Sequence, residues 1–405
     1  MPNADPFPSV RIAPQGSEPD DALALATSRR LADRIRAEAE ARGGTLPFDR
    51  FMELALYAPG LGYYVAGAQK FGPGGDFQTA PAISPLFGAC LARQAQEVLA
   101  ALGGGEILEL GAGGGELAVD ILAGLNDQAC LPRRYVILEP GTELRERQRA
   151  LIAARHPPLL DLVHWVTEVP QDFAGMVIAN EVMDAFPVHR FQVLGPGRLG
   201  EVLVGYGDQG WTECLGEPCP ALASTVEALW DRGLALAAGY ASEVNLRLGP
   251  WIAMLAARLQ AGLLVLIDYG YVQDDYYRPE RDMGTLMCHY RHQAHGNPYP
   301  HLGLQDITAH VDFTAAAWAG HEAGLELAGF TTQAHFLIAL GLEELLADAL
   351  AGQARRGDEG LEWLLGARQL VLPEAMGERF RVLGLSKGTD QTWRGFTLRD
   401  LRGRL

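Results

Sequence analysis

The sequence predicts an α/β protein with a largely parallel sheet, a helical N-terminal part and an inserted subdomain of β-hairpins and helices. Short runs of Val, Ile and Leu alternate with helical patterns, which is typical of parallel sheets. A glycine-rich turn follows the first of these runs, and the stretch between the last two alternates like hairpins with Gly-Pro-Gly turns. These observations favour one large sheet with additions.

The N-terminal third precedes the sheet. Residues 1–26 are Pro-rich and polar, show no secretory or transit signal, and are expected to be loosely ordered. Within 27–100, a helical pattern starts at Thr27 and ends at Gly43-Gly44, and a second helix covers 48–56. The next segment, "YAPGLGYYVAGAQKFGPGGDFQTAP", has neither helical nor strand periodicity, so a long functional loop is expected.

The sheet occupies the middle and end of the chain. The region 101–190 holds three strand-like runs, "EILEL", "RYVILEP" and "GMVIANE", and is expected to be the core. The region 191–260 is expected to be the insertion. The remainder, 261–405, starts with a fourth strand, "LLVLIDYGY", continues through an irregular His-rich loop at 271–312, and ends near a late strand, "FRVLGLSKG".

Composition excludes several functions. The formal charge of −17 and the pI of about 5.0 argue against a general nucleic-acid binder and favour a basic partner. The five cysteines form no CxxC pair, which predicts neither a disulfide framework nor a zinc knuckle. No apolar run reaches the roughly 20 residues that a membrane-spanning helix needs. A cytoplasmic, bacterial-type protein is expected.

The glycine turn "ELGAGGGEL" has an ExGxGxG spacing at a strand-to-helix corner; its marked residues are Glu109, Gly111, Gly113 and Gly115. Glycines there let a ligand approach the backbone and the helix N-terminus. The alternative is a tight turn that binds nothing. A dinucleotide motif needs Gly or Ala where Glu116 stands. Glu139, at the end of the next strand, is placed to hydrogen-bond a ribose. Nearby acids favour S-adenosylmethionine, whose sulfonium and ammonium groups are cationic.

Longer motifs carry a family resemblance. The segments "FMELALYAPGLGYYVAGAQKFGPGGDFQTAPAISPLFG", "ILELGAGGGELAVDIL", "NEVMDAFPVHRF", "LLVLIDYGY" and "DITAHVDFTAAAWAG" occur in the order found in the MidA-like methyltransferases. The resemblance covers about 45–400. It implies a Rossmann-like class I methyltransferase that uses S-adenosylmethionine and methylates a protein arginine. The family includes a mitochondrial enzyme that assists assembly of respiratory complex I, so a complex I subunit is an implied partner.

The resemblance also implies roles for particular residues. The three glycines at 111, 113 and 115 would form the cofactor loop, Glu139 would meet the ribose, and Asp76 and Thr79 would close over the cofactor. The stretch "NEVMDAFPV" would face the substrate. The family often has Pro and Arg where this chain has Ala112 and Gly114, and an acid where it has Ala82. These departures bear on the substrate more than on the cofactor.

The acids that follow the third strand are the candidate catalytic residues. Glu181 and Asp184 share one face if the chain turns helically after Asn180, and strand carboxyl ends are where α/β folds bind ligands. Two carboxylates can hold the charge of a guanidinium and orient it toward a methyl donor. The alternative is that Asn180 or Glu181 caps a short helix and Asp184 stabilises its first turn. Asn180 can also accept a hydrogen bond from the acceptor nitrogen.

Other polar and aromatic residues have weaker signals. Asp268 ends the fourth strand and either borders the cleft or binds the next turn. In the His-rich stretch, Asp306, His310 and Asp312 are expected to support the cleft, and a histidine can act as a base. The irregular spacing there predicts no metal site. The remaining tyrosines of interest pack on a ligand or, more commonly, in the core; they are Tyr57, Tyr63 and Tyr64.

Two rival functions stay open from the sequence. One is methylation of a small molecule or of another side chain, in which the two acids would position an amine. The other is a non-catalytic assembly protein that keeps a cofactor cavity. The arginine hypothesis differs from both because it requires the charges of Glu181 and Asp184.

Overall fold

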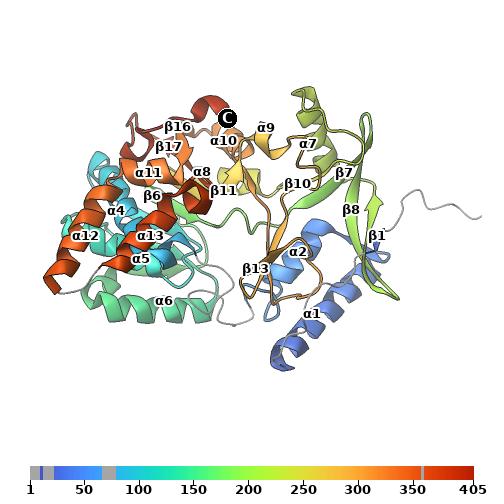
Figure 1. Ribbon diagram of the computed structural model, residues 1–405, viewed down its shortest axis with the longest axis horizontal. Helices are drawn as coiled ribbons and strands as arrows, with labels where there is room; N and C mark the ends of the chain where they lie inside the picture. The colour runs from blue at the N-terminus through green and yellow to red at the C-terminus, as the bar shows by residue number, and fades with distance from the viewer. Residues whose placement is uncertain (1–9, 12–21, 66–78, 357–359) are drawn as a thin grey trace, which may run out of the picture.

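The computed structural model describes residues 10–11, 22–65, 79–356 and 360–405. Two sheets lie side by side, with helices packed around the larger one (Figure 1). The predicted α/β fold class is confirmed by this larger sheet, in which five neighbouring strands run parallel.

The larger sheet has the strand order β16-β17-β11-β6-β3-β4-β5. Its strands are β3 (Glu106–Leu110), β4 (Tyr135–Leu138), β5 (Val163–Val166), β6 (Phe173–Asn180), β11 (Leu259–Tyr271), β16 (Glu326–Thr332) and β17 (Phe380–Lys387). Short β15 (Val311–Asp312) pairs with the end of β11. Strand β17 runs antiparallel to both of its neighbours, so the parallel part ends at β11.

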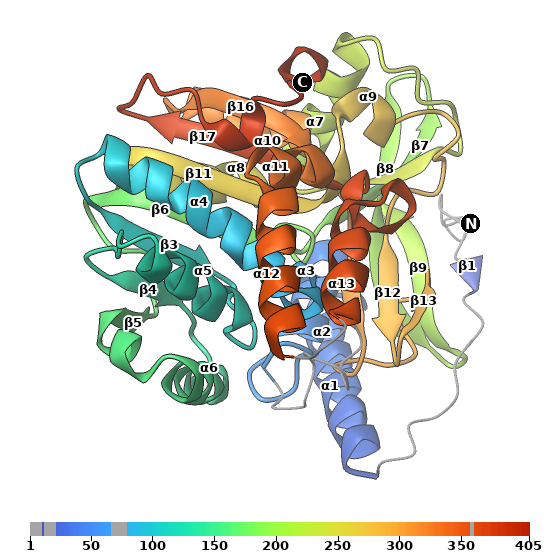
Figure 2. The same ribbon diagram turned by 60° about the vertical axis from the view of Figure 1, so that its left-hand side comes forward.

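Helices cover both faces of this sheet (Figure 2). On one face, Ile107 of β3 belongs to the cluster formed with α4 (Pro85–Ala101) and α5 (Glu116–Asp127). Its neighbour Leu108 points to the other face, toward α8 (Leu248–Arg258) and α10 (Phe313–Glu322). This alternation explains why the strands are apolar throughout, since both faces are buried. The first face also carries α6 (Thr142–Arg155), α11 (Gln333–Ala339), α12 (Leu342–Arg356) and α13 (Leu361–Val371).

The second sheet is antiparallel and has the order β1-β9-β8-β7-β10, with β2 paired to β8. Its strands are β1 (Val10–Arg11), β2 (Thr45–Pro47), β7 (His189–Gly195), β8 (Arg198–Gly207), β9 (Gly210–Gly216) and β10 (Ala241–Val244). Helices α1 (Ala22–Ala41) and α2 (Phe48–Tyr57) pack in one of its cores, and α7 (Pro220–Asp231) packs in another.

Parts of the predicted organisation need correction. The 271–312 stretch was expected to be an irregular loop, but it folds into α9 (Gln273–Tyr276) and a small sheet of order β13-β12-β14. The strands are β12 (Met287–Tyr290), β13 (Gln293–His295) and β14 (Asp306–Thr308). Helix α8, expected in the 191–260 insertion, packs against the main sheet through Ile252 and Leu255. The boundary at 260 falls inside β11 because this strand starts at Leu259.

The remaining elements are short. They are α3 (Ala80–Ile83) and the turns η1 (Pro157–Leu162), η2 (Pro373–Gly377), η3 (Arg394–Phe396) and η4 (Arg402–Arg404). No helix in the described part of the chain combines the length and apolar character that a bilayer crossing requires.

The strand order places two sequence motifs together. Strands β3 and β6 are parallel neighbours, with Leu110 in register with Ala179. The chain leaves β3 toward α5 and the far strands β4 and β5, whereas β6 leads to β11 on the opposite side. Ligands of open α/β sheets bind at such a switch point, beyond the carboxyl ends of the strands. The glycine turn and "NEVMD" both start there.

Candidate active site

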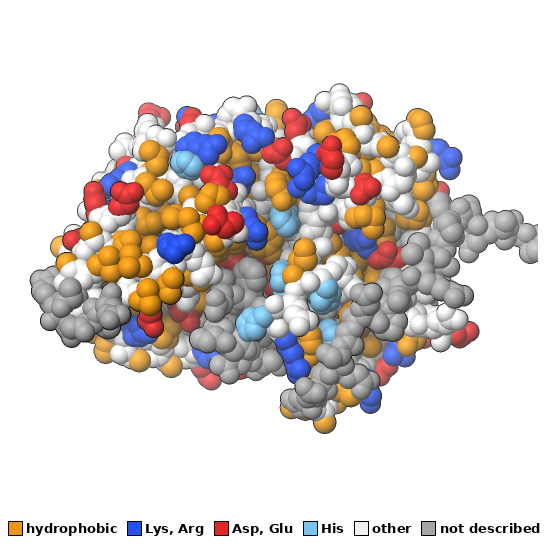
Figure 3. Space-filling view, viewed as in Figure 1, with side chains coloured by type: hydrophobic (Ala, Val, Ile, Leu, Met, Phe, Trp, Pro, Cys, Tyr) orange, Lys and Arg blue, Asp and Glu red, His pale blue; other side chains and the backbone are white. Residues whose placement is uncertain are grey.

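A cavity of about 290 Å³ opens beyond these strand ends. One side is formed by the loops after β3 and β4, and the other by the loop after β6, the end of α2, and strands β12 and β14. Its lining residues are Tyr57, Tyr63, Tyr64, Val65, Thr79, Gly111, Gly113, Leu138, Glu139, Pro140, Gly141, Leu144, Glu181, Val182, Asp184, Ala185, Phe186, Tyr269, His289, Asp306 and Thr308. Histidine side chains gather over the β13 region of the surface (Figure 3).

The glycine turn requires its glycines. Gly111, Gly113 and Gly115 have φ angles of +68°, +53° and +98°, which side chains rarely adopt. A Cβ at Gly111 would lie 2.9 Å from Cγ2 of Val182, and one at Gly115 would lie 3.2 Å from Cα of Gln148. The Gln148 amide in turn donates to the Gly113 carbonyl oxygen over 2.9 Å. The turn is therefore fixed from behind and open toward the cavity.

A smaller cavity of about 60 Å³ adjoins this turn and is lined by Thr79, Glu109 and Asn180, among others. The Tyr135 hydroxyl donates to Oε2 of Glu109 over 2.7 Å. Burial raises the pKa of Glu109 to about 7, although this hydrogen bond acts in the opposite direction. Oδ1 of Asn180 is buried and has no hydrogen-bond partner among the described residues. Both groups are therefore suited to accept hydrogen bonds from a cationic ligand.

Glu139 directly follows β4 and lines the larger cavity together with Gly111 and Gly113 of the glycine turn. Its Oε1 accepts a hydrogen bond from the backbone N–H of Gly141 over 2.7 Å, which holds the carboxylate at the cavity wall. Burial raises the pKa of Glu139, and the Gly141 N–H partly offsets this effect. A carboxylate held in this way can accept two hydroxyl donors from a ribose.

Glu181 lines both cavities, but no helix follows Asn180. The expected helical turn, and with it the helix-capping alternative, is therefore wrong. Glu181 instead has a φ of +53°, and its N–H donates to the Ile267 carbonyl oxygen over 2.9 Å, as if extending the strand. Such φ angles in a residue other than glycine are strained and cluster at functional sites. Burial and the charge of Asp184 raise the pKa of Glu181 to about 8.

Asp184 is the second carboxylate on this wall, and only 6% of its surface is exposed. Its Oδ2 accepts a hydrogen bond from the Tyr269 hydroxyl. Its Oδ1 is buried without a hydrogen-bond partner among the described residues. Burial raises the pKa of Asp184, and the Tyr269 hydrogen bond opposes this effect. An unpaired carboxylate oxygen beside a cavity is costly unless a ligand supplies a donor.

Two stacked tyrosines complete this wall. The rings of Tyr57 and Tyr64 lie 5.4 Å apart and are inclined by 22°. The Tyr57 hydroxyl donates to the Ala185 carbonyl oxygen over 2.9 Å, and the Tyr64 hydroxyl donates to Oδ1 of Asp306 over 2.9 Å. The wall thus presents aromatic faces and carboxylates, and no described lining residue is Lys or Arg. This combination suits a planar cation.

The comparisons with known proteins agree with this geometry. Residues 90–331 match a family model described as "Putative S-adenosyl-L-methionine-dependent methyltransferase". The chain belongs to this methyltransferase family. A Burkholderia thailandensis protein solved with S-adenosyl-homocysteine superposes with a TM-score of 0.90 and is 38% identical, covering 96% of this chain and 100% of that one.

Curated relatives are more distant. The Drosophila melanogaster "Protein arginine methyltransferase NDUFAF7 homolog, mitochondrial" is 27% identical over 389 residues, covering 88% of this chain and 85% of the relative. The Homo sapiens "Protein arginine methyltransferase NDUFAF7, mitochondrial" is 24% identical over 408 residues, covering 91% and 85%. Family and structural neighbour together show a methyltransferase whose cofactor is S-adenosylmethionine, as the sequence predicted.

The residues present in this methyltransferase fit that cofactor. Positive φ angles at the glycine turn leave room where side chains would project. The unpaired Oδ1 of Asn180 and the buried carboxylate of Glu109 suit an ammonium group, and Glu139 suits a ribose. Thr79 lines both cavities, as expected for a residue next to the cofactor. Asp76, predicted to close over the cofactor, lies outside the described residues.

Three residues expected at the substrate cleft do not line either cavity. Asp268 is fully buried and accepts the backbone N–H groups of Met183 and Asp184. Asp312 caps α10 by accepting the Ala315 N–H over 3.0 Å. The ring of His310 is stacked on Tyr271, with 5.2 Å between centroids. Asp268 therefore bonds a backbone loop and does not border the cleft, His310 supports the cavity residue Tyr269, as a supporting role predicted, and Asp312 caps a helix.

Sequence reasoning also missed several lining residues. Tyr269 and His289 reach the cavity from β11 and β12, and Thr308 of β14 also lines it. The only available signal was the alternation along β11, which places Tyr269 and Asp268 on opposite faces. That pattern alone does not show which face meets a ligand.

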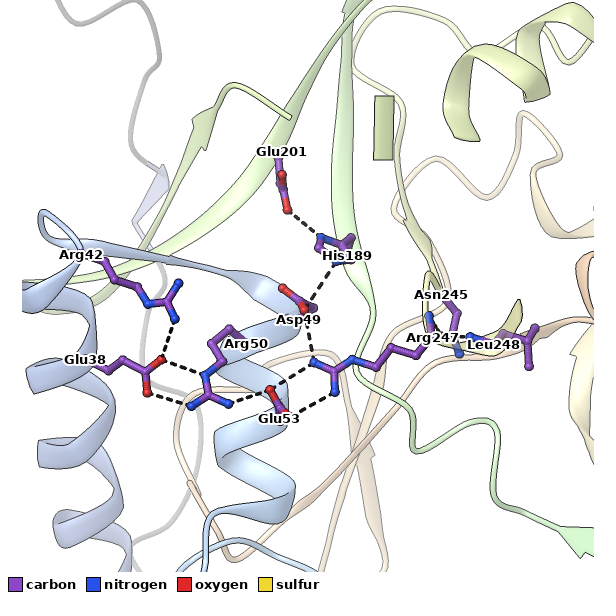
Figure 4. A network of polar contacts seen from close by, with 10 residues as sticks. All are labelled: Glu38, Arg42, Asp49, Arg50, Glu53, His189, Glu201, Asn245, Arg247 and Leu248. Carbon is purple, nitrogen blue, oxygen red and sulfur yellow. Dashed lines mark hydrogen bonds and ion pairs between the residues drawn. The ribbon is translucent and has the colours of Figure 1, made fainter. Parts of the chain in front are cut away.

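An ion-pair network fixes α2, which carries Tyr57 at its end (Figure 4). Arg247 binds both carboxylate oxygens of Glu53 over 3.1 Å and contacts Asp49 at 3.3 Å. Arg50 joins Glu53 to Glu38 of α1, which also pairs with Arg42. The helix is thereby tied to α1 and to the segment before α8, which keeps the Tyr57 side chain in place.

One group of possible metal ligands occurs within the described residues, away from both cavities. His189, Glu201 and Cys219 offer atoms within 4.8 Å of one another. Both oxygens of Glu201 are already used, one by Nδ1 of His189 at 2.7 Å and one by the Cys219 N–H at 2.7 Å. Since the carboxylate is satisfied, we interpret this group as a hydrogen-bonded link between β7, β8 and the start of α7.

Proposed function

We propose that this methyltransferase transfers the methyl group of S-adenosylmethionine to an arginine side chain of a protein. The observation that carries the proposal is the wall formed by Glu181, Asp184 and Asp306 together with the stacked tyrosines, where no described lining residue is Lys or Arg. The printed names of the curated relatives support the same acceptor. By the family resemblance, we extend the proposal to a subunit of respiratory complex I.

The roles on the cofactor side follow from the geometry. We assign Gly111, Gly113 and Gly115 to the turn against which the cofactor lies, and Glu139 to its ribose hydroxyls. Glu109 and Asn180 accept hydrogen bonds from its ammonium group. Thr79 lies at the edge of both cavities, and Asp76 remains a proposed member of the covering loop. The cofactor supplies an electrophilic methyl group when it is bound.

Arginine is a poor nucleophile because its guanidinium stays protonated and delocalised. A carboxylate pair can concentrate the positive charge on one edge and turn another nitrogen toward the methyl group. Asp184 offers its unpaired Oδ1 for one N–H, and Glu181 offers a second acceptor from the strand end. In-line transfer needs the reacting atoms about 3 Å apart, so this positioning supplies a large share of the rate.

A proton must leave the acceptor nitrogen after the new C–N bond forms. Glu181 is suited to receive it, because burial and Asp184 raise its pKa to about 8. The guanidinium's positive charge keeps Glu181 ionised while the acceptor is bound, since opposite charges favour the charged form. The carboxylate then takes the proton and releases it when the product leaves.

The test uses methyl-labelled S-adenosylmethionine, the purified protein and a proteome of the source organism. We expect label in protein, and mass spectrometry should locate it on arginine. Label in a low-mass fraction with none in protein would instead support a small-molecule methyltransferase. Cofactor binding without any transfer would support a non-catalytic assembly protein, and either result would reject the proposal.

A further inference from the structure

We propose that Asp268 and Tyr269, near the end of β11, are positioning residues that together fix the orientation of Asp184. The inference rests on the proposed function, in which Asp184 holds the acceptor. Neither residue was expected to act on Asp184, because they lie about eighty residues away in the sequence. They meet it only because β11 and β6 are parallel neighbours, with Ile267 in register with Asn180.

Asp268 controls the backbone of the loop. Its Oδ2 accepts the N–H groups of Met183 and Asp184, over 3.0 and 3.2 Å, and its Oδ1 accepts the N–H of Tyr269 over 2.9 Å. The loop after Asn180 has no helical hydrogen bonds of its own at these positions, so the carboxylate replaces them. Burial and the neighbouring Asp184 raise the pKa of Asp268, and the backbone donors oppose this.

Tyr269 controls the side chain. Its hydroxyl donates to Oδ2 of Asp184, which leaves Oδ1 as the oxygen without a partner among the described residues. The Tyr269 ring is fixed by edge-on contacts with His310, at 4.9 Å, and with Phe380, at 5.5 Å. Because the ring is fixed, the Tyr269 hydroxyl is fixed as well, and its hydrogen bond holds the Asp184 carboxylate in one rotamer. This also gives His310 a role, since it supports the ring from behind.

Asp268 and Tyr269 are neighbours on opposite faces of β11, and each has a different role. Asp268 sets where Asp184 sits, and Tyr269 sets which of its oxygens is left without a partner among the described residues. The Tyr269 hydrogen bond also favours the ionised form of Asp184. Removing it should therefore weaken acceptor binding and move the ionisation of Asp184 to higher pH, whereas a residue that only stabilises the fold would do neither.

The experiment compares Tyr269→Phe and Asp268→Asn with a matched control, Tyr277→Phe. The control also removes a buried hydroxyl, one that donates to the Glu243 carbonyl oxygen over 3.0 Å outside the cavity. For Tyr269→Phe we expect kcat/KM for an arginine peptide to fall about tenfold, mainly through KM, with unchanged cofactor affinity. The ionisation of Asp184, which lies on the acid side of the limb set by Glu181, should move to higher pH. An effect no larger than that of the control, or an unmoved ionisation of Asp184, would overturn the proposal.

A second measurement does not depend on the acceptor. The pKa of the Asp184 carboxyl can be followed by ¹³C NMR of aspartate-labelled protein, with Asp184→Asn to identify its signal. A higher pKa in Tyr269→Phe, with no change in Tyr277→Phe, supports the positioning role even if wild type fails to methylate arginine. An unchanged pKa would overturn it even if arginine is methylated. If Asp268→Asn does not fold, Tyr269→Phe still tests the positioning of Asp184.

Discussion

Replacing Glu181 by Gln removes one negative charge from the acceptor wall while preserving the size of the side chain. Glu181 touches both cavities, its N–H is held by Ile267, and its Oε1 accepts a hydrogen bond from Asn180 over 3.1 Å. The substitution therefore alters charge and proton acceptance more than shape. A hydrogen bond to a charged group contributes about 1.5–3 kcal/mol and a neutral one about 0.5–1.5 kcal/mol, so the change from a charged to a neutral acceptor lowers kcat/KM roughly 10-fold.

Loss of the proton acceptor adds to this effect. General-base groups contribute about 10²- to 10⁴-fold, so the combined loss should exceed about 10³-fold. The pH dependence of methyl transfer provides a second test of this role. In the wild type, Glu181 has a pKa of about 8 without the acceptor. It is protonated below that value and must lose the proton to bind a cation. Activity should therefore rise with pH up to about 8, and the part of this limb that Glu181 sets should disappear in Glu181→Gln, which leaves the ionisation of Asp184 at lower pH.

The assay measures label transfer from S-adenosylmethionine to an arginine peptide between pH 6 and 9, with cofactor affinity from calorimetry. Glu106→Gln is the control, because Glu106 lies at the opposite end of β3 in an ion pair with Arg134. Cofactor affinity should change little in either variant. Retention of wild-type transfer by Glu181→Gln, or an unchanged pH profile, would refute the charge-holding role.

Other predictions concern the cofactor side. Glu139→Gln should weaken S-adenosylmethionine binding about tenfold by calorimetry, because one hydroxyl acceptor is lost while the Gly141 contact can persist; unchanged affinity would place the ribose elsewhere. Gly115→Ala should lower the unfolding free energy by about 1–2 kcal/mol, because the φ angle is +98° and the new Cβ would lie 3.2 Å from Cα of Gln148. Gly207→Ala should leave the unfolding free energy nearly unchanged, because a Cβ there would meet no atom within 4 Å. S-adenosylmethionine at 100-fold its Kd should add about 2.7 kcal/mol of stability in denaturant unfolding, and no stabilisation would argue against a specific site.

The sequence was informative where local pattern and parallel topology act together. The strand-like runs before the glycine turn and before Glu181 are apolar because both faces of the sheet are buried. Parallel strands have their carboxyl ends at one edge, so the meeting of the two motifs could be predicted. The roles of individual residues, the cytoplasmic location and the domain boundaries as a whole stay predictions.

The features that the sequence did not predict depend on contacts between residues that are distant in the sequence. A helical turn after Asn180 was compatible with "EVMD", but the backbone there bonds instead to Ile267 and Asp268, which are distant in sequence. The position of Asp268 near a strand end was compatible with a cleft residue or with a hydrogen bond to a turn, and its side chain bonds the backbone of the loop after β6. The His-rich stretch pairs into a small sheet through contacts with β14 that its spacing did not show.

The central claim is that the carboxylate wall holds a guanidinium against the methyl donor. The most direct measurement is a crystal structure of this chain with S-adenosyl-homocysteine and an arginine-containing peptide. The account predicts that the guanidinium lies between Glu181 and Asp184, with an N–H donating to Oδ1 of Asp184 and a nitrogen facing the sulfur. A guanidinium bound outside the cavity, or a peptide that leaves Oδ1 of Asp184 without a donor, would contradict it.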